Sequence, residues 1–202
     1  MGGLISTIKG NKMTLIIAEA GVNHNGDAKE ALKLVKAAHQ AGADIIKFQS
    51  FISDRLVTAS ANRAKYQIRN IAREETQLQM LRQLELSCEL HHQINDECKS
   101  LGIEFLSTAF DMESLKFLTE VIGLSRLKIA SGEITNAPFV LEHARVGADI
   151  ILSTGMATLA DIESSLGVIA YGLNEGKNTS PNNTNFLKAY SSDVGQQALK
   201  EK

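Results

Sequence analysis

One short motif occurs twice in this chain of 202 residues and constrains its fold more than any other feature. Gly42-Ala43-Asp44-Ile45-Ile46 recurs with the same five residues as Gly147-Ala148-Asp149-Ile150-Ile151. Gly102 and Gly123 precede two further apolar segments of strand length. A glycine at such a place commonly ends a helix in a left-handed cap. The repeated order of strand, polar loop, helix and glycine predicts an α/β fold with parallel strands and right-handed crossovers.

This repeat predicts several strands that are parallel and adjacent in chain order. They start near Thr14, Asp44, Ile103, Arg126 and Asp149. The first, 14–18, is a continuous apolar run of the kind that a parallel sheet buries on both faces. An amphipathic helix is predicted at 28–40, with Asp27 as its cap, and further helices at 78–101 and within 186–202.

The charge balance and the cysteines limit the partners and the compartment. The chain has 21 Lys and Arg residues against 23 Asp and Glu residues, which gives no electrostatic reason to expect nucleic acid or an anionic membrane as a partner. No apolar run approaches the ~20 residues of a membrane span. Cys88 and Cys98 suit a reducing cytoplasm better than a disulfide scaffold. We therefore expect a cytoplasmic protein, with residues 1–13 as an extension before the domain.

Polar residues follow every predicted strand at the point where the apolar run stops. These residues are Glu19; Lys47 and Gln49; Ser107 and Thr108; Lys128, Ser131 and Glu133; and Ser153, Thr154 and Gly155. A charged group is costly out of water unless it is paired, so each could belong to a structural salt bridge. Parallel strands, however, have their carboxyl ends at one rim, where such groups can face a ligand. Lys47 and Lys128 therefore predict an anion site, and Glu19 and Glu133 are candidates for proton transfer.

Two other features carry weaker signals. The segment 53–75 contains several basic residues and Tyr66, and it fits either a solvated surface excursion or a substrate loop. His39, His91 and His92 lack convincing metal-ligand spacing, so we expect them at the surface or at helix ends.

Five motifs together resemble the sialic acid synthase family, which includes the N-acetylneuraminate, legionaminate and pseudaminate synthases. In chain order they are the segments 18–27 (AEAGVNHNGD), 46–49 (IKFQ), 106–111 (LSTAFD), 128–133 (KIASGE) and 151–156 (ILSTGM). They occur in the order of that family, and the resemblance extends from Thr14 to about Tyr171.

The resemblance implies a TIM-type (β/α)8 barrel, of which residues 14–202 would hold the first five βα units. It implies that C3 of phosphoenolpyruvate attacks the open-chain aldehyde of an N-acetylated aldose such as N-acetylmannosamine, which gives a nonulosonic acid and free phosphate. Glu19 and Glu133 would be catalytic, and Gln49 and, by a looser match, Tyr66 would contact the sugar. By motif position, the phosphoenolpyruvate ligands would be Lys47, Thr108, Lys128, Ser131 and Ser153.

The chain departs from the family pattern after its fifth predicted strand. We find no counterpart of the family's sixth strand, of its metal-binding histidines or of its C-terminal antifreeze-like domain. The resemblance implies a manganese or magnesium ion and a homodimer for the full-length enzyme. Because the histidine ligands of that ion are absent from this sequence, we expect the chain alone to be inactive.

Two alternative functions fit the same residues. The first is another phosphoenolpyruvate–aldose condensing enzyme, of the 3-deoxy-octulosonate or heptulosonate phosphate type, whose sugar needs an additional basic phosphate site. The second is a non-catalytic partial barrel that binds an anion, or a partner at its open strand edge.

Overall fold

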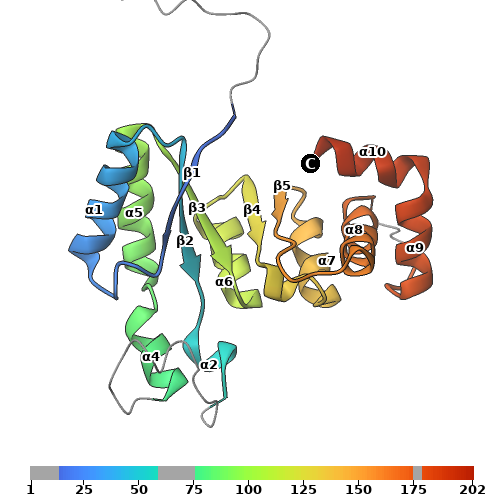
Figure 1. Ribbon diagram of the computed structural model, residues 1–202, viewed down its shortest axis with the longest axis horizontal. Coiled ribbons are helices and arrows are strands. Elements are labelled where there is room, and N and C mark those ends of the chain that lie inside the picture. Colours follow the sequence, from blue (N-terminus) through green and yellow to red (C-terminus); the bar gives the residue numbers. More distant parts are fainter. Residues whose placement is uncertain (1–13, 59–75, 175–178) are drawn as a thin grey trace, which may run out of the picture.

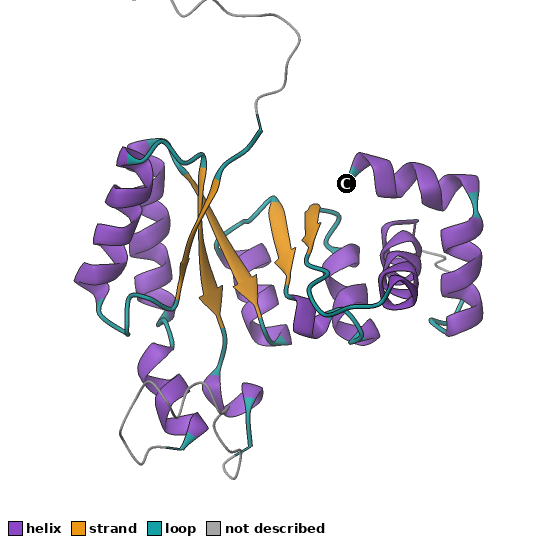
Figure 2. Ribbon diagram, in the orientation of Figure 1, coloured by secondary structure: helices purple, strands orange, loops and turns teal. Residues whose placement is uncertain are grey.

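The computed structural model describes residues 14–58, 76–174 and 179–202, which form one sheet with helices packed beside it (Figure 1). All of its strands are parallel, and they lie in the order β1-β2-β3-β4-β5 (Figure 2). The strands are β1 (Ile17–Gly21), β2 (Ile45–Ser50), β3 (Glu104–Ala109), β4 (Arg126–Ile129) and β5 (Asp149–Leu152). The predicted direction and order of the strands are thus confirmed. The expected extension 1–13 and Tyr66 lie outside the described residues.

The helices mostly connect one strand to the next. They are α1 (Ala28–Gln40), α2 (Ser53–Leu56), α4 (Gln77–Leu84), α5 (Cys88–Leu101), α6 (Met112–Lys116), α7 (Ala137–Arg145), α8 (Leu159–Asn174), α9 (Asn183–Ser191) and α10 (Asp193–Glu201), with a π-helical turn η1 (Phe117–Val121) and a 3-10 turn η2 (Ser131–Glu133). In the part of the chain that the structure describes, no helix is both long and apolar enough to span a bilayer.

The core lies between the helices and one face of the sheet, which we call the helix face. Alternate strand residues such as Ile46, Phe48 and Phe105 pack there against Val35 of α1 and Ile94 of α5. A second apolar cluster continues the core beyond β4, where Ile129 packs with residues of α7 and α8. Because side chains alternate across a strand, the residues between these point to the opposite face, which we call the inner face.

The first helix agrees with its prediction and the first strand does not. Asp27 caps α1, and its carboxylate accepts hydrogen bonds from the backbone of Lys29 and Glu30 at 2.7 and 3.1 Å. The strand was expected at 14–18, but Leu15 and Ile16 are 52% and 56% exposed. These residues precede the first β1–β2 pair, Ile17 with Ile45, so no neighbouring strand covers them.

The predicted helix 78–101 is also wrong, because it is two helices. Ser87 caps α5 by accepting a hydrogen bond from the Leu90 backbone at 3.1 Å, which starts a new helix there. Glu85 has extended backbone, and its carboxylate accepts hydrogen bonds from the backbone and hydroxyl of Ser53. Near the C-terminus, Ser192 likewise separates α9 from α10 and caps the second helix.

Candidate active site

The site is built on the inner face by the alternation of strand residues. Lys47 and Gln49 alternate with Ile46 and Phe48, which are in the core, so both polar side chains belong to the inner face. The register then aligns polar residues across the sheet. Glu19 pairs with Lys47, Gln49 with Thr108, and Thr108 with Lys128.

Glu19 and Lys47 form an ion pair at the start of this row. The Lys47 side chain is only 12% exposed, whereas that of Glu19 is 55% exposed. Gly21 brings Gln49 into the same group, because a Cβ at Gly21 would lie 3.3 Å from Glu19 Oε1 and 3.7 Å from Gln49 Nε2. The φ of +54° at Gly21 also favours glycine, so sequence and backbone agree here.

Lys128 lies in the same electrostatic environment from the next strand but one. Its ammonium donates hydrogen bonds to the Ser153 hydroxyl at 2.5 Å and to the Ile129 carbonyl at 3.3 Å. Burial lowers the pKa of Lys128, the positive charge of Lys47 lowers it further, and Glu19 acts in the opposite direction. Lys47 and Lys128 therefore share one face and act on each other, as an anion site would require.

The remaining predicted site residues lie on β3 and in η2, the turn after β4. Thr108 is 3% exposed on the inner face. Ser131 lies in η2 beside the turn after β5, since a Cβ at Gly155 would be 3.6 Å from the Ser131 hydroxyl. Glu133, at the end of η2, accepts a hydrogen bond from Asn136 at 2.8 Å rather than from either lysine, within the described ranges.

Two expectations about polar residues were wrong. Ser107 does not line the rim beside Thr108, because it faces the helices, is 1% exposed and lies 2.7 Å from the Ser50 hydroxyl. His91 is not at the surface: it is 3% exposed and its Nε2 lies 2.6 Å from Ser50 Oγ. Sequence analysis overlooked Ser50, although its position next to Gln49 assigns it to the helix face.

None of the described histidines fits the expected metal ion. His24 follows β1 but is fully buried, and its Nδ1 accepts a hydrogen bond from the Gly26 backbone at 3.0 Å. Burial lowers the pKa of His24, so the ring is neutral and its proton is on Nε2, where a metal would have to bind. Among residues 14–58, 76–174 and 179–202, no cluster of three His, Cys, Asp or Glu side chains could hold an ion.

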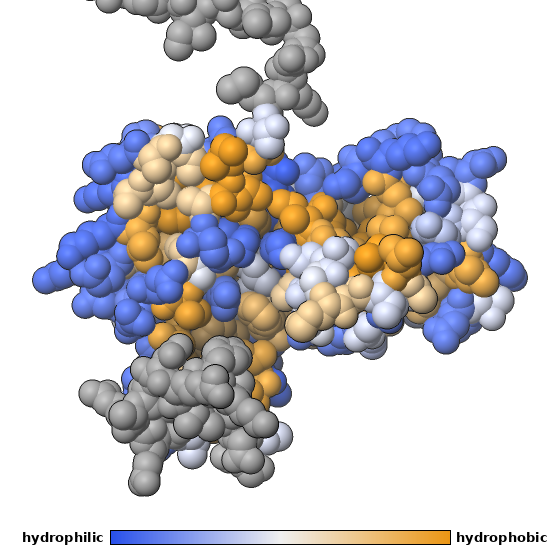
Figure 3. Space-filling view, in the orientation of Figure 1, coloured by the Kyte–Doolittle hydropathy of each residue, from blue (hydrophilic) through white to orange (hydrophobic). Residues whose placement is uncertain are grey.

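The inner face is partly exposed beside this site. In Figure 3, hydrophobic patches in orange are exposed among hydrophilic residues over the region of the strands. All residues of β5 are half-buried, and Met156 and Leu159 after it are 101% and 85% exposed. The C-terminal residue lies at the outer edge of β5, where the Ile150 backbone N–H donates to the Lys202 carbonyl at 3.2 Å.

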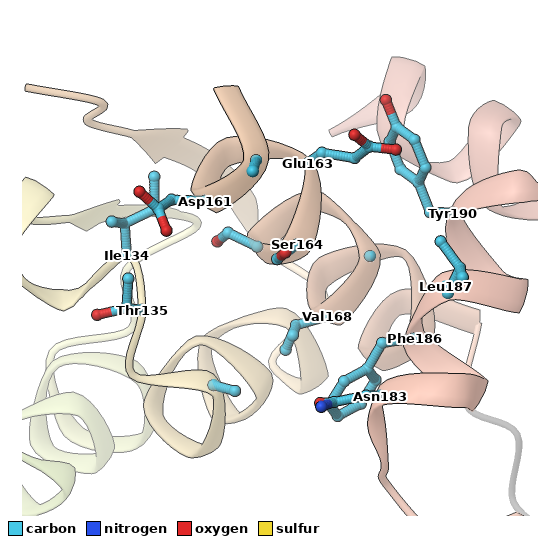
Figure 4. Close-up of a pocket in the computed structure, with 14 residues that line it drawn as sticks. Ile134, Thr135, Asp161, Glu163, Ser164, Val168, Asn183, Phe186, Leu187 and Tyr190 are labelled. Atoms are coloured by element: carbon cyan, nitrogen blue, oxygen red, sulfur yellow. The ribbon is translucent and has the colours of Figure 1, made fainter. Parts of the chain in front are cut away.

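A pocket of about 450 Å³ lies apart from this site, between η2–α7, α8 and α9 (Figure 4). Its lining includes Ile134 and Thr135, which follow Glu133, together with Asp161, Phe186 and Tyr190. None of the predicted site residues lines it. The predicted site residues of the described chain therefore lie outside this pocket.

Comparison with known proteins assigns the chain to a family. The sequence profile of the NeuB family matches residues 34–192. The chain belongs to the NeuB family. It is 49% identical over 158 residues to the N,N'-diacetyllegionaminic acid synthase of Campylobacter jejuni, covering 78% of this chain and 47% of that protein. It is 47% identical over 162 residues to the synthase of the same name from Legionella pneumophila, covering 80% of this chain and 45% of that protein.

Solved structures in the NeuB family share the fold. The crystal structure of an N-acetylneuraminic acid synthetase from Leptospira borgpetersenii, in complex with citrate, aligns with a TM-score of 0.69 and 30% identity, over 81% of this chain and 52% of that one. The spsE spore coat polysaccharide protein of Bacillus subtilis aligns with a TM-score of 0.61 and 32% identity, over 78% and 40%. The chain therefore spans about half the length of the relatives that it matches, and its five strands form part of a TIM-type barrel. The predicted resemblance and fold class are confirmed.

Proposed function

We propose that this chain is the phosphoenolpyruvate-binding part of a nonulosonic acid synthase. The observation that carries the proposal is the shared environment of Lys47 and Lys128 on the inner face, beside the hydroxyl of Ser153. Two ammonium groups and nearby hydroxyls suit a ligand that carries both a phosphate and a carboxylate. The citrate of the Leptospira structure is also a carboxylate ligand, which agrees with anion binding by a relative.

In this proposal the lysines bind and orient phosphoenolpyruvate. Lys47, Thr108, Lys128, Ser131 and Ser153 hold its anionic groups, and Gln49 contacts the sugar; Tyr66, outside the described residues, is assigned to the sugar by its motif alone. C3 of phosphoenolpyruvate then forms a bond to the aldehyde carbon of an open-chain N-acetylated aldose. Water adds at C2, and phosphate leaves with cleavage of its C–O bond. The products are a nonulosonic acid and phosphate, so all atoms are accounted for.

Glu19 and Glu133 have different positions in this scheme. Glu19 is ion-paired to Lys47 and adjacent to Gln49, so it suits orientation of the ligands and proton transfer close to the lysines. Within the described residues, the Glu133 carboxylate accepts a hydrogen bond from the Asn136 side chain and keeps lone pairs available for the proton of an attacking water. We assign the water-activating role to Glu133.

Identity and charge favour one product among the alternatives. The N,N'-diacetyllegionaminic acid synthases are 49% and 47% identical to this chain, whereas the pseudaminic acid synthase of Campylobacter jejuni is 34% identical. A sugar phosphate would need another free cation. Among the described strand residues, the third cation is Arg126, which already contacts Glu104 at 3.0 Å and Asp149 at 3.8 Å. We therefore propose an unphosphorylated, diacetylated sugar as the substrate.

Several further features belong to the same proposal. We place residues 14–202 in the barrel domain, with 1–13 as an extension, and propose a cytoplasmic homodimer for the whole protein. A manganese or magnesium ion would polarise the aldehyde oxygen in such a reaction. Because the described residues do not fit such an ion, its ligands would have to come from elsewhere, and we expect the chain alone to release no phosphate.

Calorimetric titration of phosphoenolpyruvate into the chain tests the binding proposal. We expect saturable binding that Lys128→Met weakens at least tenfold, because charge-assisted hydrogen bonds contribute ~1.5–3 kcal/mol each. Lys116→Met, at an exposed lysine of α6, is the matched control and should bind normally. Equal binding by both variants would contradict the site.

A phosphate-release assay with N-acetylmannosamine, a diacetylated hexose and manganese tests the catalytic expectation. Turnover by this chain alone would contradict its predicted inactivity, because catalysis would then need no residue beyond those present. Sedimentation of the same sample gives its oligomeric state, and a monomer at all concentrations would count against the homodimer.

A further inference from the structure

A fully buried hydrogen-bond relay crosses the helix face directly behind the candidate site. It consists of Ser107 in β3, Ser50 in β2 and His91 in α5, which are 1%, 2% and 3% exposed. The Ser50 hydroxyl lies 2.7 Å from that of Ser107 and 2.6 Å from His91 Nε2. On the other side of the ring, His91 Nδ1 lies 2.9 Å from the carbonyl oxygen of Ser87.

The chemistry of the groups assigns a direction to every bond in this relay. The Ser87 carbonyl can only accept, so His91 carries its proton on Nδ1. Burial lowers the pKa of His91 and so favours the neutral ring, in which Nε2 is an acceptor. Ser50 therefore donates to Nε2, and Ser107 donates to Ser50. Each buried polar group is satisfied, and the ring is further fixed by edge-on contact with Phe117 at 5.3 Å between centroids.

The relay is one residue away from the ligand side chains on both strands. Ser50 follows Gln49, and Ser107 precedes Thr108, with Gln49 and Thr108 paired across the sheet. Because neighbouring residues point to opposite faces, a bond between the two serines fixes the backbone that carries the two site residues. Thr108 in turn pairs with Lys128, so the constraint extends to the third strand of the site.

Apolar side chains could fill the space that these three polar side chains occupy. The surrounding core is built from Phe48, Phe105 and Leu90, and buried polar groups can be replaced by apolar ones of similar shape at little cost in stability. Directional hydrogen bonds specify the geometry of the strands more strictly than apolar packing does, because they form at only one register and one strand separation.

We propose that Ser50, Ser107 and His91 are positioning residues for the candidate site, acting on the phosphoenolpyruvate position through Thr108 and on the sugar position through Gln49. The inference rests on the proposed function for its ligand. It predicts that loss of the relay reduces phosphoenolpyruvate affinity beyond what loss of stability explains. Residues that orient metal ligands change affinity or activity about 10- to 100-fold, and we expect a comparable effect of this relay on phosphoenolpyruvate affinity.

The test separates a loss of phosphoenolpyruvate affinity from a loss of stability. Ser50→Ala removes the hydrogen bonds of Ser50 to His91 and to Ser107. It should weaken phosphoenolpyruvate binding about tenfold, when binding is measured well below the melting temperature of the variant. Ser50→Thr keeps the hydroxyl and should restore most of the affinity. Val140→Ala, at a fully buried residue of α7 away from the relay, should lower the melting temperature without changing affinity. Ser165→Ala removes a buried hydroxyl that has no hydrogen-bond partner among the described residues, and should change neither.

The outcomes separate this inference from the proposed function. Wild-type binding with an unchanged Ser50→Ala affinity would overturn the relay and leave the function intact. Absence of wild-type binding would overturn the function for this chain, and the relay is then judged by NMR. In that case the amide resonances of Gln49 and Thr108 should shift in Ser50→Ala and return in Ser50→Thr, and unchanged resonances would overturn it. Ser107→Ala, which keeps the Ser50–His91 bond, replaces Ser50→Ala if that variant does not fold.

Discussion

The two faces of the sheet have different roles, stability on the helix face and ligand binding on the inner face, although the residues concerned are adjacent in the chain. On the helix face, Phe48 is fully buried in the main apolar cluster and contributes to stability. On the inner face, its neighbour Lys47 is also largely buried, but its partners are Glu19 and the charge of Lys128. Two like charges buried near each other destabilise the fold unless an anion binds between them. The inner face is therefore less stable without its ligand. The same strand therefore carries a structural and a functional residue at successive positions.

The largest effect should come from testing these neighbours against each other. Phe48→Ala leaves a cavity beside Phe105 and should lower the free energy of unfolding by about 3–5 kcal/mol. Lys47→Met removes a partly exposed ion pair and should change it by less than about 1 kcal/mol, while phosphoenolpyruvate binding is lost. Urea unfolding followed by circular dichroism measures both. Comparable losses of stability would show that the two faces do not divide their roles.

An effect of intermediate size is expected at acidic pH, where buried histidines should lower the free energy of unfolding. Burial is the main cause that lowers the pKa of His24, His91 and His143 from the usual 6.5. The unfolded chain then binds more protons, so the stability is fully present above pH 6.5 and is lost as the pH falls through the lowered values.

Unfolding free energies between about pH 7.5 and about pH 5.5 test this expectation, with at most about 1.4 kcal/mol per pH unit from each histidine. His91→Gln should reduce the slope. His39→Gln, at an exposed histidine of α1, should leave it unchanged. A flat profile in the wild-type chain would contradict the neutral, buried state of these rings.

The sequence predicted the inner face better than the helix face, and the reason is physical. A lysine at the end of an apolar strand is conspicuous, because burial of its charge requires an explanation, and this led to Lys47 and Lys128. Ser50 and His91 gave no such signal. Serine and histidine are common at helix ends and surfaces, and only the packing of α5 against β2 brings His91 within 2.6 Å of Ser50.

Boundaries were the other weak point, because local capping decides them. Nothing in the apolar period of 78–101 shows a break, and the break depends on the Ser87 hydroxyl accepting the Leu90 backbone N–H and on Glu85 turning toward Ser53. The repeat of glycine and strand, in contrast, depends on long-range order along the whole chain. It therefore predicted the order of all five strands, even where the start of β1 was misplaced.

The smallest expected effect is a loss of phosphoenolpyruvate affinity at alkaline pH, which depends on the charge of Lys128. Because burial and Lys47 lower the pKa of Lys128 from the usual 10.5, its ammonium loses its proton earlier than a surface lysine does. Phosphoenolpyruvate is fully ionised well below this range, since a phosphate monoester has its second pKa at about 6. The affinity should therefore fall a few-fold as the pH rises toward the lowered pKa of Lys128, and the ligand itself does not contribute to the change.

Lys128→Arg isolates the group that titrates. Arginine stays charged throughout, so this variant should bind more weakly at neutral pH, because its fork does not match the Ser153 geometry, but its affinity should not decline at alkaline pH. Lys116→Arg is the control and should keep the wild-type decline. Dissociation constants at about pH 8 and about pH 9.5 decide the matter, because only a charged Lys128 gives a charge-assisted bond. The same decline in Lys128→Arg would show that Lys128 is not the group that titrates.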